Sequence, residues 1–289
     1  MSKLTLSIFL ISVLSICSAS AKIRSEQLPF IFYVTIPVEL ADKTIQVSAQ
    51  YRVPRDQGDD ALPAVIIIHT SGGVDSTGGF YAKALNKAGI ATLELDLWGA
   101  RDLLGGTEDR PGLPQETLPD TFAALKYLAE RDEIDANKIG IMGFSWGGVL
   151  SILTTTEHYM AMSGSLYRFA GHVAHYPVCW VYNFLPGFEI NHLTGAPLLI
   201  QAAELDGYDI ASSCPSMVES LPEADQAYVE LKVYESTYHA WDRLEPELVV
   251  FDPFAHLGQG GYVTLSPDKH IARKSKRKVV KFFKEIFQL

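Results

Sequence analysis

Residues 138–153, KIGIMGFSWGGVLSIL, hold a glycine-flanked serine between two apolar runs. The centre of this stretch, Gly143-Phe144-Ser145-Trp146-Gly147, fits the pattern G-x-S-x-G. The run before Ser145 is typical of a buried strand, and the run after it is typical of a helix. A serine on a sharp turn between a strand and a helix can serve as a nucleophile, and the tight turn leaves no room for Cβ atoms at the flanking glycines. The pattern alone also fits a plain strand-to-helix turn, so the rest of the chain has to decide.

The rest of the chain alternates between apolar, β-branched stretches and longer stretches with helical periodicity. This alternation predicts an α/β fold, with a mostly parallel central sheet flanked by helices. The first two strands are joined by a short polar turn and are expected to pair antiparallel. Segments 179–196 and 242–267 are too short to form a large cap domain. About eight strands are expected, at residues 30–38, 44–53, 64–69, 90–96, 138–144, 169–178, 197–205 and 227–236.

The first 21 residues have the pattern of a secretory signal. Lys3 precedes an apolar run that is too short to span a bilayer comfortably, and Ala19-Ser20-Ala21 follows it. This order predicts cleavage near Ala21 and export to the periplasm or the extracellular space. Residues 22–289 are then expected to form a single domain. No later segment is long and apolar enough to cross a membrane, so no stable membrane insertion is expected after cleavage.

The balance of charge argues against a nucleic-acid partner, because the 289 residues carry a formal net charge of -10. The exception is the basic run RKSKRK at residues 273–278. Apolar residues follow it at helical spacing, which predicts the solvent-facing side of a final amphipathic helix over about residues 268–287.

A serine nucleophile needs a base to accept its proton and an acid to orient that base. In α/β-hydrolases the order along the chain is serine, acid, histidine, each in a loop after a strand. Asp206 and Asp209 follow the strand expected at 197–205, and His239 follows the next one. We expect Asp206 to be the acid because it comes first in its loop, with Asp209 as the alternative.

An acyl-transfer enzyme also needs two donors directed at the developing oxyanion. The backbone N–H of Trp146, directly after the nucleophile, is expected to be one donor. The other is expected from the loop TSGG after the strand at 64–69, where Ser71 is the first choice and Thr70 the alternative. His69 is expected to brace this loop. No H-x-x-x-H or similar pattern occurs, so neither a metal nor another cofactor is expected.

Four stretches, IIIHTSGG, GFSWGG, AELDGYD and YHAWD, together resemble the dienelactone hydrolase family of α/β-hydrolases. The resemblance covers about residues 65–289 and implies Ser145 as nucleophile, His239 as base and Asp206 as acid. The segment DLWGARD resembles one that often carries an arginine near the site, which implies Arg101 as an anchor for an anionic group. The founding members use cysteine as nucleophile, and their oxyanion loop begins His-Gly where this chain has His69-Thr70. The resemblance therefore does not imply a dienelactone substrate.

Further residues stand near the expected site loops. Trp98 and Trp241, like Trp146, are expected either to wall an apolar substrate pocket or to belong to the core. Two cysteines, Cys179 and Cys214, remain after signal cleavage in a compartment that permits disulfides. Either one bridge between them or two buried free thiols fits the sequence.

The function that these features favour is an exported serine hydrolase of small-molecule carboxylic esters or lactones. A serine peptidase is an alternative on the same fold, but peptidases of this kind often carry a large extra domain or cap. A thioesterase is another, although export argues against acyl-CoA substrates. An alternative of a different class, a non-catalytic binding protein, would be signalled by loss of a triad residue, and all three are present in order.

Overall fold

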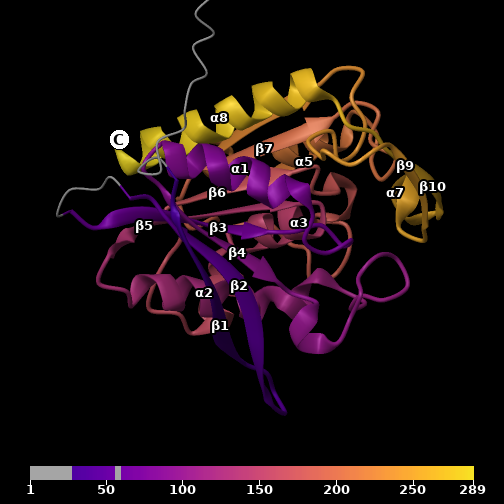
Figure 1. The fold of residues 1–289 in the computed structure, drawn as a ribbon. Coiled ribbons are helices and arrows are strands. Elements are labelled where there is room, and N and C mark those ends of the chain that lie inside the picture. The colour runs from indigo at the N-terminus through magenta and orange to yellow at the C-terminus, as the bar shows by residue number, and fades with distance from the viewer. Residues whose placement is uncertain (1–27, 56–59) are drawn as a thin grey trace, which may run out of the picture.

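The computed structural model describes residues 28–55 and 60–289, and the predicted signal at residues 1–21 lies outside them. Most of the described chain forms an eight-stranded sheet with helices on both faces (Figure 1). The strands lie in the order β1-β2-β4-β3-β5-β6-β7-β8. Their bounds are β1 (Phe30–Glu39), β2 (Thr44–Val53), β3 (Leu62–Ile68), β4 (Ala91–Asp96), β5 (Ile134–Phe144), β6 (Gly171–His175), β7 (Leu198–Ala203) and β8 (Val229–Tyr234).

The direction of the strands matches the prediction from sequence. Strand β1 pairs antiparallel with β2, and β2 pairs antiparallel with β4, whereas all pairs from β4 to β8 are parallel. Every residue of β3 and of β7 is buried. Central parallel strands are covered on both faces, which explains why these segments read as continuous apolar runs. The predicted mostly parallel α/β sheet is therefore confirmed.

Helices cover the two faces of the sheet in separate groups. Helices α1 and α8 lie on one face and α2 on the other (Figure 1). The helices are α1 (Ser76–Lys87), α2 (Leu118–Ala129), α3 (Trp146–Leu153), α4 (Glu157–Ser163), α5 (Ser213–Ser220), α6 (Glu223–Gln226), α7 (Ala255–Gly258) and α8 (Lys269–Phe287). Short 3-10 turns are η2 (Gly99–Arg101), η3 (Pro114–Thr117) and η4 (Cys179–Val181).

Helix α8 confirms the interpretation of the basic run near the C-terminus. Val279, Phe283 and Phe287 are fully buried against the sheet, whereas Arg273 and Arg277 are exposed. The apolar stripe holds the helix on the core and leaves the cations in solvent. Within the residues that the structure describes, no helix has the combination of length and hydropathy needed to cross a membrane.

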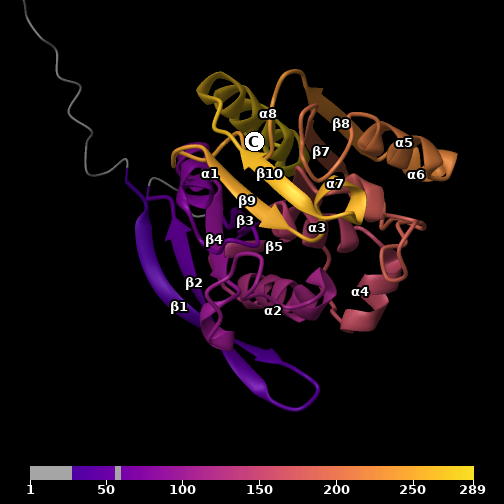
Figure 2. The same ribbon diagram turned by 90° about the vertical axis from the view of Figure 1, so that its right-hand side faces the viewer.

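Segment 242–267 contains a feature that the sequence did not predict. It forms a separate antiparallel hairpin of β9 (Leu248–Asp252) and β10 (Gly261–Leu265), with α7 between the two strands (Figure 2). The hydroxyl of Thr107, in the long loop after β4, donates to the carbonyl of Phe251 at 2.8 Å. The hairpin is thus attached to a loop far from it in the sequence.

Candidate active site

The turn between β5 and α3 has the strained geometry that the sequence predicts. Ser145 has φ 50° and ψ -107°, a conformation that non-glycine residues rarely adopt. A Cβ atom on Gly143 would collide with the backbone of Gly147, and one on Gly147 would collide with the backbone of Ile68. The N–H of Ser145 donates to the carbonyl of His175 at 2.9 Å, which fixes the turn to the end of β6. The glycines are required because the turn packs directly on neighbouring strands.

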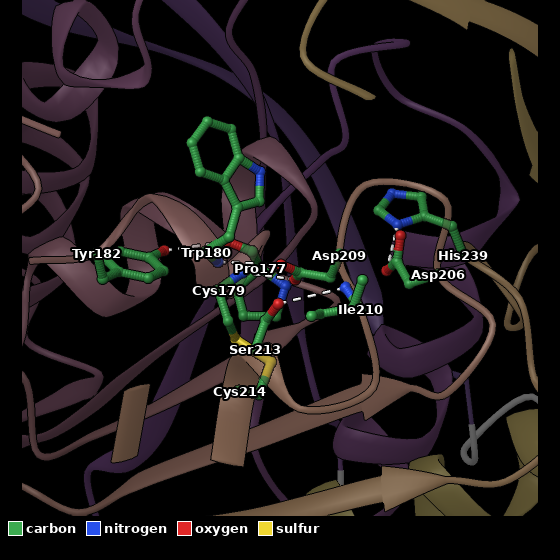
Figure 3. Close-up of a disulfide and its surroundings, with 10 residues drawn as sticks. All are labelled: Pro177, Cys179, Trp180, Tyr182, Asp206, Asp209, Ile210, Ser213, Cys214 and His239. Carbon is green, nitrogen blue, oxygen red and sulfur yellow. Dashed lines mark hydrogen bonds and ion pairs between the residues drawn. A yellow bond between two sulfur atoms is a disulfide. The ribbon is translucent and has the colours of Figure 1, made fainter. Parts of the chain in front are cut away.

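His239 and Asp206 form a buried pair in the loops that follow β8 and β7. Nδ1 of His239 lies 2.7 Å from Oδ2 of Asp206, and the two side chains are each 3% exposed (Figure 3). A carboxylate only accepts, so Nδ1 carries the hydrogen and Nε2 is left as the basic nitrogen. The rings of Tyr176 and Tyr208 lie with their centroids 4.5 and 4.7 Å from that of His239. The imidazole is therefore held in one tautomer and one orientation.

In the described part of the chain, no hydrogen bond joins Ser145 to His239, whose Nδ1 is the ring nitrogen that is bonded. Ser145 lines the cavity described below, and its side chain is almost completely buried. Hydrogen bonds between a nucleophile and its base are often long in an enzyme without substrate and shorten when substrate binds. The structure therefore shows the His239–Asp206 pair and the Ser145 turn as separate features, each beside the loops that the sequence predicted for the site.

Asp209, the alternative acid, has a different role in the structure. Its two carboxylate oxygens accept from the N–H groups of Cys179 at 2.6 Å and Trp180 at 2.9 Å (Figure 3). Burial and the nearby Asp206 raise the pKa of the Asp209 carboxyl to about 7. His239 is thus paired with Asp206, and Asp209 fixes the start of η4.

The two remaining cysteines form a disulfide. Cys179, at the start of η4, is bonded to Cys214 in α5, and their Cα atoms are 4.9 Å apart. Of the two options that the sequence left open, the structure has the bridge. It joins the loop after β6 to the helix after β7, and both segments lie beside the candidate site (Figure 3).

Two backbone N–H groups are available for an oxyanion. Those of Trp146, the first residue of α3, and Ser71, in the loop after β3, have no acceptor in the described part of the chain. Ser71 is held in place because its carbonyl accepts from Nε1 of Trp98 at 3.0 Å. A developing oxyanion requires two such donors.

His69 braces the loop after β3, as the sequence predicted. Its Nδ1 lies 2.6 Å from the carbonyl of Thr70, and its Nε2 accepts from the N–H of Leu97 at 3.0 Å. Burial lowers the pKa of the His69 imidazole to about 4, so the ring is neutral at pH 7. A neutral ring can donate at one nitrogen and accept at the other, which both contacts require.

A mainly apolar cavity of about 630 Å³, part of it open to solvent, lies beside Ser145. Ser71, Ser145 and Trp146 contribute to its wall, so Ser145 and the two residues with free N–H groups border the same space. The remaining lining residues are Arg110, Gly112, Leu113, Pro114, Val149, Val178, Val181, Leu185, Phe188, Tyr208, Asp252 and Phe254.

Three predicted substrate-binding residues do not line this cavity. The guanidinium of Arg101 donates two hydrogen bonds to the carboxylate of Asp120, at 2.8 and 2.7 Å. Arg101 thus neutralises a buried carboxylate and does not face the cavity. Trp241 is fully buried, and its Nε1 lies 3.3 Å from Oγ of Ser275 in the core. Trp98 packs behind the site against Trp146, with ring centroids 5.5 Å apart. Of the two roles that the sequence left open for Trp98 and Trp241, the structure has the core role. The implied role of Arg101 as an anchor for an anionic group is corrected, because its guanidinium is paired with Asp120.

The arginine that does line the cavity is Arg110, which the sequence analysis did not single out. It lies in the glycine- and proline-rich loop after β4, nine residues beyond Arg101. Its partner is Asp252 in β9, 142 residues away in the sequence. No local pattern connects the two, and the only signal was the length of the loop that carries Arg110.

The fold, the sharp turn at Ser145 and the order of the loops are those of an α/β-hydrolase. The chain belongs to the dienelactone hydrolase family, whose model matches residues 49–287. It is 24% identical over 190 residues to the probable 2-oxo-3-(5-oxofuran-2-ylidene)propanoate lactonase of Bradyrhizobium sp., covering 62% of this chain and 73% of that protein. It is also 29% identical over 107 residues to an uncharacterized protein of Pseudomonas aeruginosa, covering 36% of this chain and only 29% of that relative.

Solved structures of esterases have a similar fold. A Pyrobaculum calidifontis esterase superposes with a TM-score of 0.63 at 16% identity, covering 90% of this chain and 87% of that one. Esterase 2 of Thermogutta terrifontis, phosphorylated by paraoxon, gives a TM-score of 0.62 at 14% identity, covering 88% of this chain and 94% of that one. At these identities the likeness establishes the fold.

Proposed function

We propose that this protein is a serine hydrolase that cleaves carboxylic ester or lactone bonds. The observation that carries the proposal is the buried His239–Asp206 pair, at 2.7 Å. The ring of Tyr208 packs on His239 and lines the same cavity as Ser145, which supports a site made of all three residues. Membership of the dienelactone hydrolase family and the lactonase relative support the class of bond. Ser145 acts as nucleophile, His239 as base and Asp206 as orienting acid.

The reaction follows from the roles of these groups. Ser145 Oγ attacks the carbonyl carbon while Nε2 of His239 accepts its proton, and Asp206 stabilises the imidazolium. The N–H groups of Trp146 and Ser71 bind the oxyanion, an interaction that lowers the barrier by a few kcal/mol, roughly 3 per donor. His239 then protonates the leaving alcohol. Water repeats the sequence on the acyl-enzyme and releases the acid.

Labelling with a fluorophosphonate probe tests the nucleophile. The similar esterase of T. terrifontis is phosphorylated by paraoxon, which makes an organophosphorus probe a suitable choice. We expect peptide mapping to find the label on Ser145, and no label on the Ser145→Ala or His239→Ala variants. Both variants should lose nearly all hydrolysis of p-nitrophenyl acetate while keeping a native circular dichroism spectrum. Normal hydrolysis by either folded variant would contradict the mechanism, and no labelling of the wild type would favour a binding protein.

We also propose that the chain is exported. The order of charge, apolar run and small residues in the first 21 residues supports this, and so does the Cys179–Cys214 disulfide, because such bonds persist in oxidising compartments. The full chain should accumulate outside the cytoplasm of a bacterial host, with a mass that corresponds to a start near Lys22. An unprocessed chain with two alkylatable thiols would contradict export.

A further inference from the structure

Two charged side chains line the cavity beside Ser145, and they neutralise each other. Nη2 of Arg110 lies 3.1 Å from Oδ1 and 3.0 Å from Oδ2 of Asp252. The side chains are 9% and 1% exposed, so the pair is shielded from bulk water. Among the described residues that line the cavity, no other carries a formal charge. The Arg110–Asp252 pair therefore adds an arginine to the wall but no net charge.

Further contacts hold this pair in place. The hydroxyl of Tyr208 and the N–H of Phe254 each donate to Asp252 at 2.9 Å. The guanidinium of Arg110 lies over the rings of Trp146 and Phe254, 5.7 and 5.8 Å from their centroids. Together these contacts hold the carboxylate of Asp252 and the guanidinium of Arg110 side by side.

The rest of the wall is suited to an apolar ligand. Aliphatic and aromatic side chains dominate it: Leu113, Val149, Val178, Val181, Leu185 and Phe188. A carboxylate that entered this space would lose water and meet an arginine whose charge is already compensated. An alkyl or aryl group would lose no hydrogen bond on entering and would bury apolar surface.

We propose that this cavity binds an uncharged, apolar group of the substrate, and that Asp252 determines this specificity by neutralising Arg110. The proposal rests on the ester or lactone hydrolysis proposed above. It makes the β9–β10 hairpin a specificity element, because the hairpin supplies Asp252. A chain with Arg110 but without Asp252 would accept substrates that carry a carboxylate.

Boronic acids test the proposal because they carry a single substituent. Ser145 Oγ bonds to boron, the hydroxyl proton passes to His239 and nothing leaves, so the one alkyl chain is free to occupy the cavity. The probes are pentylboronic acid and 5-boronopentanoic acid, in which a carboxylate replaces the terminal methyl. Inhibition of p-nitrophenyl acetate hydrolysis gives both Ki values. For the wild type we expect pentylboronic acid to bind at least ten-fold more tightly.

Two variants test the role of the pair. Asp252→Asn leaves the charge of Arg110 uncompensated and should tighten binding of the carboxylate probe about ten-fold or more. Arg110→Met leaves the charge of Asp252 unpaired and should weaken binding of the same probe further. If thermal unfolding shows that Asp252→Asn does not fold, Arg110→Met still tests the pair. A ratio of Ki values that neither variant changes would overturn the role of Asp252.

The outcomes for the inference and for the proposed function differ. Equal or tighter binding of the carboxylate probe to the wild type would overturn the inference and would mean that Asp252 orients Arg110 toward an anion. If p-nitrophenyl acetate is not hydrolysed and Ser145 is not labelled, the proposed function itself fails. Normal hydrolysis with a reversed preference contradicts the inference alone.

Discussion

At the residue scale, Asp206 and Asp209 lie three positions apart but bind different partners. Asp206 orients His239, whereas Asp209 accepts from two backbone N–H groups at the start of η4. Asp206→Asn should lower kcat by about four orders of magnitude, because the amide favours the wrong imidazole tautomer. Asp209→Asn is the matched control and should change the melting temperature more than kcat. Steady-state kinetics and thermal unfolding of both variants check this, and a larger loss of turnover in Asp209→Asn would identify it as the acid instead.

The pH dependence of stability should depend on His69. Its pKa is lowered by burial from 6.5 to about 4, so below pH 6.5 the unfolded chain binds a proton that the folded chain rejects. The neutral ring makes its full contribution to the free energy of unfolding above pH 6.5. This contribution, about 3 kcal/mol at most, is lost as the pH falls toward 4. Glutamine at this position also donates and accepts but does not titrate. The free energy of unfolding, measured with urea between pH 7 and about pH 4, should fall less steeply for His69→Gln than for the wild type. The same pH dependence in both proteins would contradict the role of His69.

At the scale of elements, the parts predicted from sequence are those specified by local pattern. The turn around Ser145 was predictable because its glycines and its flanking apolar runs lie within a few residues of one another. Buried parallel strands such as β3 and β7 were equally clear. The β9–β10 hairpin was not, because Leu248, Val249 and Phe251 in β9 are partly exposed and show no clean alternation. Asp252 and Arg110 meet only through folding, and no spacing rule connects them.

The disulfide links two elements that border the site, and its loss should affect both stability and binding. It closes a loop with a sequence separation of 35, for which chain entropy predicts roughly 3–4 kcal/mol of stabilisation. Helix η4 also ends at Val181, which lines the cavity. The double variant Cys179→Ala and Cys214→Ala should therefore melt at a lower temperature and have a raised KM for apolar esters. The wild type in dithiothreitol should behave in the same way, and an unchanged melting temperature in both cases would contradict a stabilising role.

At the scale of the whole molecule, a buried polar network connects the core to the site. Both oxygens of Asp242 accept hydrogen bonds, from Tyr176 at 2.7 Å and from Tyr81 at 2.8 Å, and Oδ2 also lies 2.9 Å from Nδ1 of His175. All four side chains are almost completely buried. Burial raises the pKa of both tyrosines, so each remains a donor. The network joins α1, β6 and the loop that carries His239, which sequence alone did not indicate.

Removing the central carboxylate of this network should destabilise the entire fold. Asp242→Ala leaves His175 and Tyr176 without this acceptor in a buried site, and Tyr81 keeps only Ser275 as a partner, at a cost of about 3–5 kcal/mol. The melting temperature should fall by roughly 10 °C. Asp242→Asn keeps the shape of the side chain and one acceptor oxygen, so its melting temperature should fall less.

Because Tyr176 packs on His239, a folded Asp242→Asn variant should also show reduced kcat with little change in KM. Thermal unfolding and kinetics of the two variants measure these effects, and an Asp242→Ala variant as stable as the wild type would show that the network does not stabilise the fold.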